Sequence, residues 1–164
     1  MGFSTTYLGR FDISPVLNRE EVEWLRSYAR MLDRDPDDPY AVPMNPGAAP
    51  LVEHPESRAG STWRSDGLFR CDWQPCPDGC CLVWQGTEKS NNAMRELTYL
   101  IDHFLRPGAH AHRDQRSDFA AFTFDHVVKG VIAAERGDTR KLFLLEARDN
   151  EIVERTLVPG SSEW

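Results

Sequence analysis

The chain has 164 residues and a mass of 18.7 kDa, which fits one domain with enough length for a real core. It is 40% hydrophobic and 27% charged, the composition of a globular protein and not of a disordered one. The formal net charge of −7 argues against a global grip on nucleic-acid phosphates, because such a grip needs a basic face.

The sequence shows neither the pattern of a signal peptide nor that of a membrane span. Residues 1–10 lack the charged and apolar regions of a signal peptide, and no apolar run approaches the roughly 20 residues that a membrane span requires. Four cysteines without a secretion signal favour reduced thiols over a disulfide framework. We therefore expect a cytoplasmic protein that does not bind a membrane.

The N-terminal part predicts a strand and then a helix. In residues 5–13, Tyr7, Phe11 and Ile13 share one side of an alternating pattern that ends at Ser14-Pro15. Asn18 is a good N-cap, and apolar residues then recur at helical spacing from about 19 to 32.

Residues 33–67 predict a long loop, because six prolines interrupt any regular pattern. A loop of this length in a compact domain is either a surface excursion or a binding loop. The sequence leaves both interpretations open.

The middle of the chain predicts a hairpin and a second helix. Alternating residues from Leu68 to Gln74 form the first strand, Asp78-Gly79 closes the turn, and residues 80–85 return. An amphipathic helix from about 91 to 105 follows and ends at Pro107-Gly108. Residues 106–118 predict a polar loop.

The C-terminal part predicts a three-stranded meander. Its strands cover residues 127–135, 141–147 and 152–158, and Asp149-Asn150 makes a tight turn before the last of them. Residues 119–125 either extend the first of these strands or cross to it.

This order of elements predicts an α+β fold. Two amphipathic helices that cover one face of an antiparallel sheet form a two-layer sandwich. The order βαββαβ matches a ferredoxin-like arrangement, and the last two strands add a C-terminal β-hairpin extension. We expect a single domain over residues 1–158, with 159–164 as a tail.

Two groups of residues are considered as metal ligands. The four cysteines lack the paired C-x2-C knuckles of a zinc ribbon, and the first of them alternates with Phe69 and Trp73 as a core residue does. The run from His110 to Asp114 resembles an H-x-H-x-D ligand set, but such a site needs further ligands from other strands. We predict no metal and no cofactor, although the sequence leaves open whether either group ever binds one: Cys71, Cys76, Cys80, Cys81, His110 and His112.

Standard catalytic motifs do not occur. The stretch from Gly86 to Ser90 is only superficially similar to a phosphate loop, because Glu88 and Val83 stand where glycines are required. A nucleophilic pair of Cys80 or Cys81 with His103 or His126 would need hydrogen-bond reach, which a sequence does not reveal.

An aromatic and polar cluster remains as the candidate site. Its members come from the predicted hairpin, the turn after it and the second helix. Core packing accounts for the tryptophans in one interpretation, and a ligand pocket or partner-docking patch accounts for them in the other. The candidate ligand- or partner-binding residues are Trp73, Trp84, Glu88, Lys89, Tyr99 and His103.

The stretch from Leu68 to Pro107 carries a distinctive pattern. It reads L-F-R-C-D-W over 68–73, D-G over 78–79, L-V-W-Q-G-T-E-K over 82–89 and Y-L-I-D-H-F-L-R-P over 99–107. In this the chain resembles a family of small proteins from actinobacteria and their phages, although Ser90-Asn91 replaces an aromatic pair of that family. The resemblance implies a bacterial cytoplasmic origin and one domain. It implies no reaction, because the family has no assigned activity.

Three classes of function stay open. The favoured one is a non-catalytic, small acidic binding or regulatory protein, such as an inhibitor or immunity-type protein that acts on a protein partner. The second is an enzyme of unrecognised type around Glu88, Lys89 and His103, with Glu or His as general base. The third is a structural module that forms a homo-oligomer through the open edge of the last strand.

Overall fold

The computed structural model of the chain describes residues 2–31, 38–42, 71–87 and 89–161. Most of the predicted proline-rich loop, the start of the predicted hairpin strand at Leu68 and the candidate residue Glu88 lie outside these ranges. Among the described residues, no helix has the length and apolar character to cross a membrane.

The N-terminal strand is broken by a glycine. β1 (Thr5–Leu8) and β2 (Arg10–Ser14) both pair antiparallel with β5 (Val127–Arg136), so the single predicted strand forms two shorter ones. Gly9, between them, has a φ of +121°, and a Cβ there would lie 2.9 Å from Cγ2 of Ile132. Only glycine fits this bend without strain.

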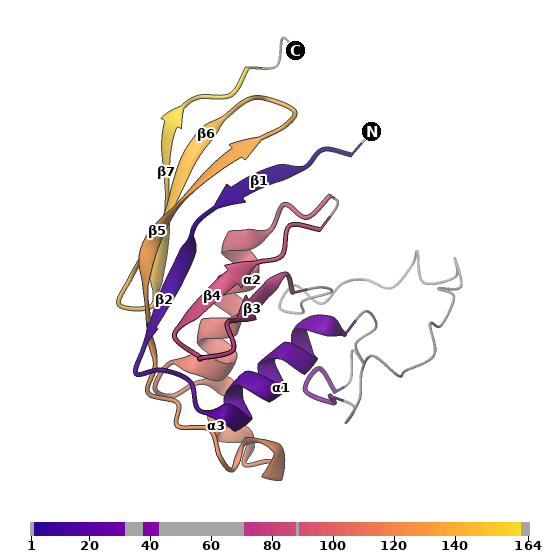
Figure 1. The fold of residues 1–164 in the computed structure, drawn as a ribbon, viewed down its shortest axis with the longest axis vertical. Coiled ribbons are helices and arrows are strands. Elements are labelled where there is room, and N and C mark those ends of the chain that lie inside the picture. The colour runs from indigo at the N-terminus through magenta and orange to yellow at the C-terminus, as the bar shows by residue number, and fades with distance from the viewer. Residues whose placement is uncertain (1, 32–37, 43–70, 88, 162–164) are drawn as a thin grey trace, which may run out of the picture.

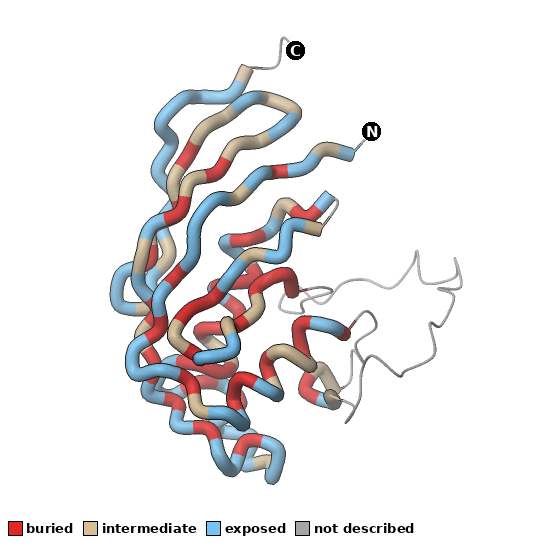
Figure 2. The backbone as a smooth tube through the Cα atoms, viewed as in Figure 1, coloured by how far each residue is buried: buried red, intermediate tan, exposed pale blue. Residues whose placement is uncertain are grey.

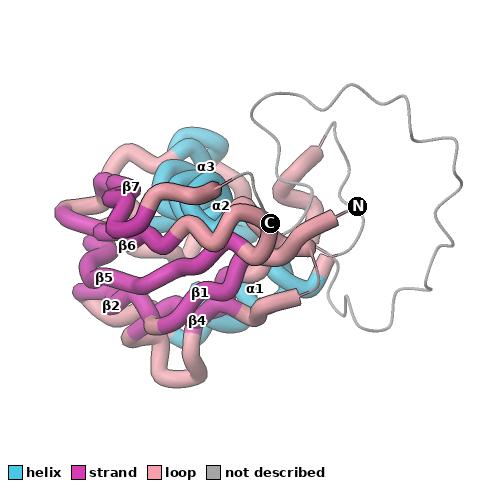
Figure 3. Tube along the Cα trace, turned by 90° about the horizontal axis from the view of Figure 1, so that it is seen from above, coloured by secondary structure: helices cyan, strands magenta, loops and turns pink. Residues whose placement is uncertain are grey.

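The described strands form one seven-stranded antiparallel sheet. Figure 1 shows these strands beside α1 and α2, and Figure 3 shows the sheet from above. The described strands follow the order β3-β4-β2-β5-β6-β7, and β1 pairs with β5 beside this path. The predicted hairpin and the predicted meander are both present, with the following bounds: β3 Trp73–Pro75, β4 Cys81–Trp84, β6 Leu142–Arg148 and β7 Glu151–Val158.

Two main helices accompany the sheet, which confirms the α+β prediction. α1 (Arg19–Arg30) begins with a capping box, in which Asn18 and Glu21 each bind the other's backbone N–H. α2 (Ala93–Leu100) continues directly into a π-helical turn, η3 (Ile101–Leu105). Together, α2 and η3 span most of the second predicted helix.

The segment between η3 and β5 differs from the prediction. Within the expected polar loop, α3 (His110–Asp114) and the 3-10 turn η4 (Ser117–Phe119) form, and residues 120–126 are neither strand nor helix. Buried Ala111 and Phe119 anchor the two short elements, so packing against the core decides their conformation where the local pattern does not.

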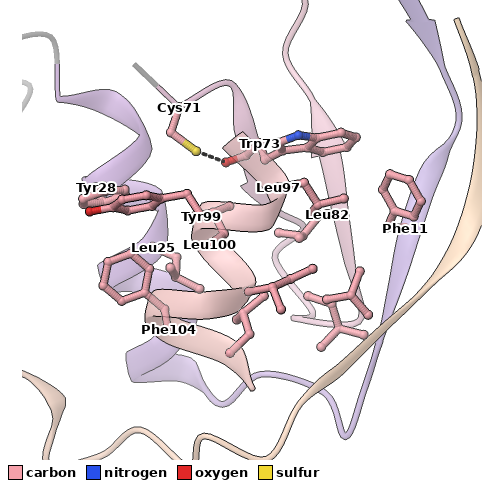
Figure 4. Packing of buried hydrophobic residues seen from close by; sticks show 14 of the residues in the cluster. Phe11, Leu25, Tyr28, Cys71, Trp73, Leu82, Leu97, Tyr99, Leu100 and Phe104 are labelled. Carbon is pink, nitrogen blue, oxygen red and sulfur yellow. Dashed lines mark hydrogen bonds between the residues drawn. The ribbon is translucent and has the colours of Figure 1, made fainter. Parts of the chain in front are cut away.

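The core lies between the helices and one face of the sheet (Figures 2 and 4). Along β2, Phe11 and Ile13 are buried while Arg10 and Asp12 are exposed. Phe11 meets Trp73 of β3 at 5.4 Å between ring centroids. The opposite face of the sheet stays exposed at several apolar positions among the described residues: Leu8, Val83, Val131 and Val153.

Candidate functional site

The two tryptophans of the predicted cluster meet across the β3–β4 hairpin. Trp73 and Trp84 are paired in register, and their rings make an edge contact at 5.2 Å between centroids. Trp73 is 1% exposed, and its Nε1 donates a hydrogen bond to the carbonyl of Ala93 at 2.8 Å. This bond ties the hairpin to the first residue of α2, so Trp73 is a core residue.

Trp84 is more accessible and carries an unusual polar atom. Its ring contacts Tyr7 at 4.9 Å between centroids. Its Nε1 is buried, yet it has no hydrogen-bond partner among the described residues.

Lys89 lies near the N-terminal segment. It adopts a left-handed backbone with a φ of 59°, and its N–H donates to Oγ of Ser4 at 3.2 Å. Its aliphatic side chain lies beside Gly2.

The other two candidate residues stack at the far end of α2. The rings of Tyr99 and His103 lie 3.7 Å apart at an angle of 13°, and the ring of His110 is 4.5 Å from that of His103. Nδ1 of His103 shares a short hydrogen bond with the hydroxyl of Tyr40. Burial raises the pKa of Tyr40 above its ordinary value, and the neighbouring Tyr99 adds to this effect. Tyr40 lies in the segment predicted as a loop, and no local sequence signal pointed to it.

The predicted cluster is therefore divided between the two ends of one helical segment. Ala93 and His103 are ten positions apart, which corresponds to about 15 Å along a helix. Lys89 precedes Ala93 and His103 follows the last α-helical turn, so the two do not face one another across a small substrate. The ring of His103 makes a hydrogen bond to Tyr40. The ring of His126 makes hydrogen bonds to Glu21, Thr123 and Pro15. None of these partners is a cysteine, so these bonds give no support to a nucleophilic Cys–His pair.

A cavity of about 600 Å³ adjoins Tyr40. Its wall includes Asp38 and Arg116, which form an ion pair at 2.6 Å, and Arg116 also reaches Asp114 at 3.1 Å. The guanidinium of Arg116 lowers the pKa of Asp38 below its ordinary value. Asp118 also lines this cavity, so its described wall carries two aspartates and one arginine.

A second cavity of about 520 Å³ lies between α2, the N-terminal segment and the β5–β6–β7 meander. Arg136 and Lys141 project over the aromatic rings of Phe3 and Phe143 in its wall. Each of the two cations also contacts a carboxylate, from Asp138 and Glu154 respectively. Both of these cations in the second cavity are therefore paired with a carboxylate.

Three of the four thiols gather at the turn of the β3–β4 hairpin. The sulfur atoms of Cys76, Cys80 and Cys81 all lie within 4.8 Å of one another. Cys71 is apart from them, since its Sγ donates to the carbonyl of Trp73 at 3.5 Å in the core. These three side chains are the described residues that could hold a metal ion.

The thiols of this cluster differ in acidity. Burial alone would raise the pKa of Cys76, but hydrogen bonds from Cys81 and Cys80 lower it to about 7. Burial, together with the negative charge on Cys76, raises the pKa of Cys81 to about 12. Cys76 is therefore the more acidic of these two thiols.

Besides the cysteine cluster, the structure contains a buried pair of a carboxylate and an imidazole. The sequence analysis did not predict this pair. Glu21 and His126 are each 1% exposed, and Oε1 of Glu21 lies 3.0 Å from Nε2 of His126. Oε1 also accepts the backbone N–H of Thr123 at 2.8 Å. The capping-box spacing from Asn18 to Glu21 is the one sequence signal that could have singled out this carboxylate.

The longest unpaired sheet edge belongs to β7. Among the described residues β7 pairs only with β6, and seven of its eight positions are exposed. The opposite edge is β3, which has three residues and ends at Pro75. β7 also carries three exposed large apolar side chains: Val153, Leu157 and Val158.

Comparisons with known proteins yield no relative. No family model, no curated protein and no solved structure matches the chain.

Proposed function

We propose that the protein is a non-catalytic binding protein that acts on a protein partner, as an inhibitor or an immunity-type protein does. The observation that carries this proposal is the edge strand β7, which is eight residues long and accessible along almost its whole length. An exposed strand edge presents a row of backbone donors and acceptors that an extended segment of another chain can pair with.

The side chains of β7 add an apolar component to this backbone edge. Val153 is 58% exposed and Leu157 is 47% exposed, although both are large and hydrophobic. Proteins often cover the unpaired backbone of a long edge or protect it with charged side chains, lysine above all, or with proline. β7 has neither lysine nor proline, and its charged residues are Glu151, Glu154 and Arg155. A partner segment added to β7 would bury these side chains.

The charge of the chain indicates the chemistry of the partner. With a formal net charge of −7, the chain would attract a basic protein and speed its diffusional encounter. We therefore propose that the partner is basic and contributes an extended segment.

A double substitution tests the edge. Val153→Lys with Leu157→Lys places two charges on exposed positions of β7, so the fold is retained while strand addition becomes unfavourable. The matched control is Val16→Lys, because Val16 is equally exposed but lies between β2 and α1. The partner is first identified by capture from the native host and is then purified for calorimetric titration.

The proposal predicts a clear difference between these variants. The β7 variant should bind the purified partner at least about tenfold more weakly, which corresponds to about 1.4 kcal/mol, and Val16→Lys should bind as the wild type does. Equal affinity of the wild type and the β7 variant would refute the edge as the docking site. Chemical conversion of the purified partner by this protein would refute the proposal that the protein is non-catalytic.

A second copy of the chain is the second candidate partner, and the apolar residues of β7 favour it. Two β7 strands that pair antiparallel are related by a two-fold axis perpendicular to the sheet, so residues that stand opposite each other come from the same face of the strand. An axis through position 155 places Val153 opposite the partner's Leu157, and both side chains are exposed in the single chain.

Sedimentation of the purified chain distinguishes the two candidates. A homodimer through β7 should dissociate in the variant with Val153→Lys and Leu157→Lys, which sets like charges opposite each other. Val16→Lys is again the control, because Val16 lies outside β7. A monomeric wild type at high concentration would exclude this second candidate and leave the basic partner.

We also propose that β2, α1, β3, β4, α2 and β5 form a ferredoxin-like unit with the β6–β7 hairpin added at one side. The support is the strand order β3-β4-β2-β5 and the antiparallel pairing of each neighbouring pair. An enzyme built on Lys89 and His103 gains no comparable support, since these residues lie at opposite ends of α2.

A further inference from the structure

The turn of the β3–β4 hairpin collects three sulfur atoms on one side of the sheet. Cys76 precedes the turn, Cys80 ends it and Cys81 is the first residue of β4. The N–H of Cys76 donates to the carbonyl of Cys81 at 2.9 Å, so these two residues close the hairpin. The Sγ atoms of Cys76 and Cys80 are 3.5 Å apart.

The backbone that carries the thiols is held at several points. The N–H of Gly79 donates to the carbonyl of Cys76 at 3.0 Å, which closes the turn itself. The carbonyls of Gly79 and Cys80 accept the N–H groups of Leu17 and Ile13, so the turn is fixed to the segment that links β2 to α1. A Cβ on Gly79 would lie 2.5 Å from the carbonyl oxygen of Leu17, which shows how closely the two backbones approach. The thiols are therefore positioned by backbone hydrogen bonds of the hairpin and its neighbouring segment.

The spacing of the sulfur atoms suits one small cation. With a metal–sulfur distance of about 2.3 Å, tetrahedral geometry places the sulfurs about 3.8 Å apart. One pair in the cluster stands at 3.5 Å, and all three atoms lie within 4.8 Å of one another. Side-chain rotations that move each sulfur by less than about 1 Å would complete the geometry.

We propose that Cys76, Cys80 and Cys81 bind a thiophilic d¹⁰ cation of the Zn²⁺ class, with three thiolate ligands and one position left for a further ligand. Binding replaces the thiol protons, which pass to solvent, with three metal–sulfur bonds. Soft thiolates select such ions over hard cations like Mg²⁺.

Water would complete the coordination. Asp12 of β2 is the Cα partner of Cys81 and projects from the same face of the sheet. Its carboxylate contacts Arg10 at 3.4 Å, and it is not among the residues whose ligand atoms lie within 4.8 Å of one another.

The test uses the full-length chain, reduced and freed of metal. Titration with Co²⁺ under anaerobic conditions reports thiolate ligands through intense sulfur-to-cobalt charge-transfer absorption, and competition with Zn²⁺ then gives the affinity for zinc. Three variants are compared with the wild type: Cys76→Ser, Cys80→Ser and Cys71→Ala. Far-ultraviolet circular dichroism of each variant without metal establishes that the fold is present.

The proposal predicts one ion per chain and charge-transfer absorption in the wild type and in Cys71→Ala. Loss of one thiolate in Cys76→Ser or Cys80→Ser should weaken zinc binding by about 100-fold or more, beyond the 10- to 100-fold effect of changes outside the ligand shell. Zinc binding of unchanged strength in both serine variants, or absence of charge-transfer absorption in the wild type, would overturn the site. A Cys76–Cys80 disulfide without metal in protein isolated under anaerobic conditions would overturn it as well.

Discussion

Nε2 of His126 and Oε1 of Glu21 lie 3.0 Å apart in the interior, where each side chain is 1% exposed. Nδ1 of the same imidazole lies 2.7 Å from the carbonyl oxygen of Pro15. The carboxylate of Glu21 and the carbonyl of Pro15 are both acceptors, so this arrangement favours the positively charged imidazole, in which both ring nitrogens donate. This pair joins the start of α1 to the segment before β5, which are about a hundred residues apart along the chain.

The first prediction concerns the pH dependence of stability. Burial alone would lower the pKa of His126, but its hydrogen bonds to Glu21 and Pro15 raise it above 6.5. Its contribution to stability is therefore full below pH 6.5 and is lost as the pH rises through the raised pKa. For Glu21, burial opposes the charged form, yet hydrogen bonds from His126, Thr123 and Asn18 lower the pKa below 4.5. Its contribution is full above pH 4.5 and is lost as the pH falls through the lowered pKa.

Urea unfolding of the wild type at a series of pH values measures this dependence. The free energy of unfolding should be greatest between the two limits and should fall on both sides. His126→Gln should flatten the alkaline side, because a glutamine does not titrate. An alkaline side that is equally steep in His126→Gln would show that another group causes it.

The second prediction concerns the removal of one partner of the pair. Glu21→Gln leaves the imidazolium buried without its counter-charge, and this should lower the free energy of unfolding by about 3 to 5 kcal/mol. Glu20→Gln is the matched control, since Glu20 is exposed in the same first turn of α1. Chemical denaturation at neutral pH measures both variants. A loss below about 1 kcal/mol in Glu21→Gln would mean that the imidazole is neutral in the fold.

The sequence predicted the elements whose hydrophobic pattern depends on residues only a few positions apart. The alternation around Phe11 and the helical spacing after Asn18 depend on neighbours within a few positions, and both elements formed where expected. Asp149-Asn150 likewise made the tight turn before β7. A periodic pattern of this kind reports directly which face of an element is buried.

Contacts between residues that are far apart along the chain could not be predicted in the same way. Tyr40 meets His103 across 63 positions, and Glu21 meets His126 across 105. Backbone pairing across the hairpin brings Cys76 beside Cys81, and the spacing of these cysteines matches no standard zinc motif. The break at Gly9 also depends on Ile132 of another strand, so the sequence alone favoured one continuous strand.

The third prediction concerns that break. Gly9→Ala forces a side chain into a positive-φ conformation and against Cγ2 of Ile132, and this should lower the free energy of unfolding by about 1 to 3 kcal/mol. Gly86→Ala is the control, because Gly86 also has a positive φ but a Cβ there would approach only Trp84, at 3.9 Å. Thermal unfolding should show a larger loss in Gly9→Ala. Equal losses would assign the cost to the backbone conformation alone.

The fourth prediction concerns Tyr40. Burial, with a smaller contribution from Tyr99, keeps its pKa above the ordinary value of 10.0, so its phenol should ionise later than exposed tyrosines do. Spectrophotometric titration of phenolate absorbance in the wild type and in Tyr40→Phe isolates this group by difference. A difference spectrum that appears at or below pH 10 would place Tyr40 in contact with solvent.

The two edges of the sheet are unequal, and this limits how copies of the chain can associate. β3 offers three residues and ends at Pro75, which has no N–H to donate, whereas β7 offers eight. Of the two described edges, β7 is therefore the one suited to strand addition. A pairing of β7 with β7 would occupy this edge in both molecules, so such an association would end at two chains.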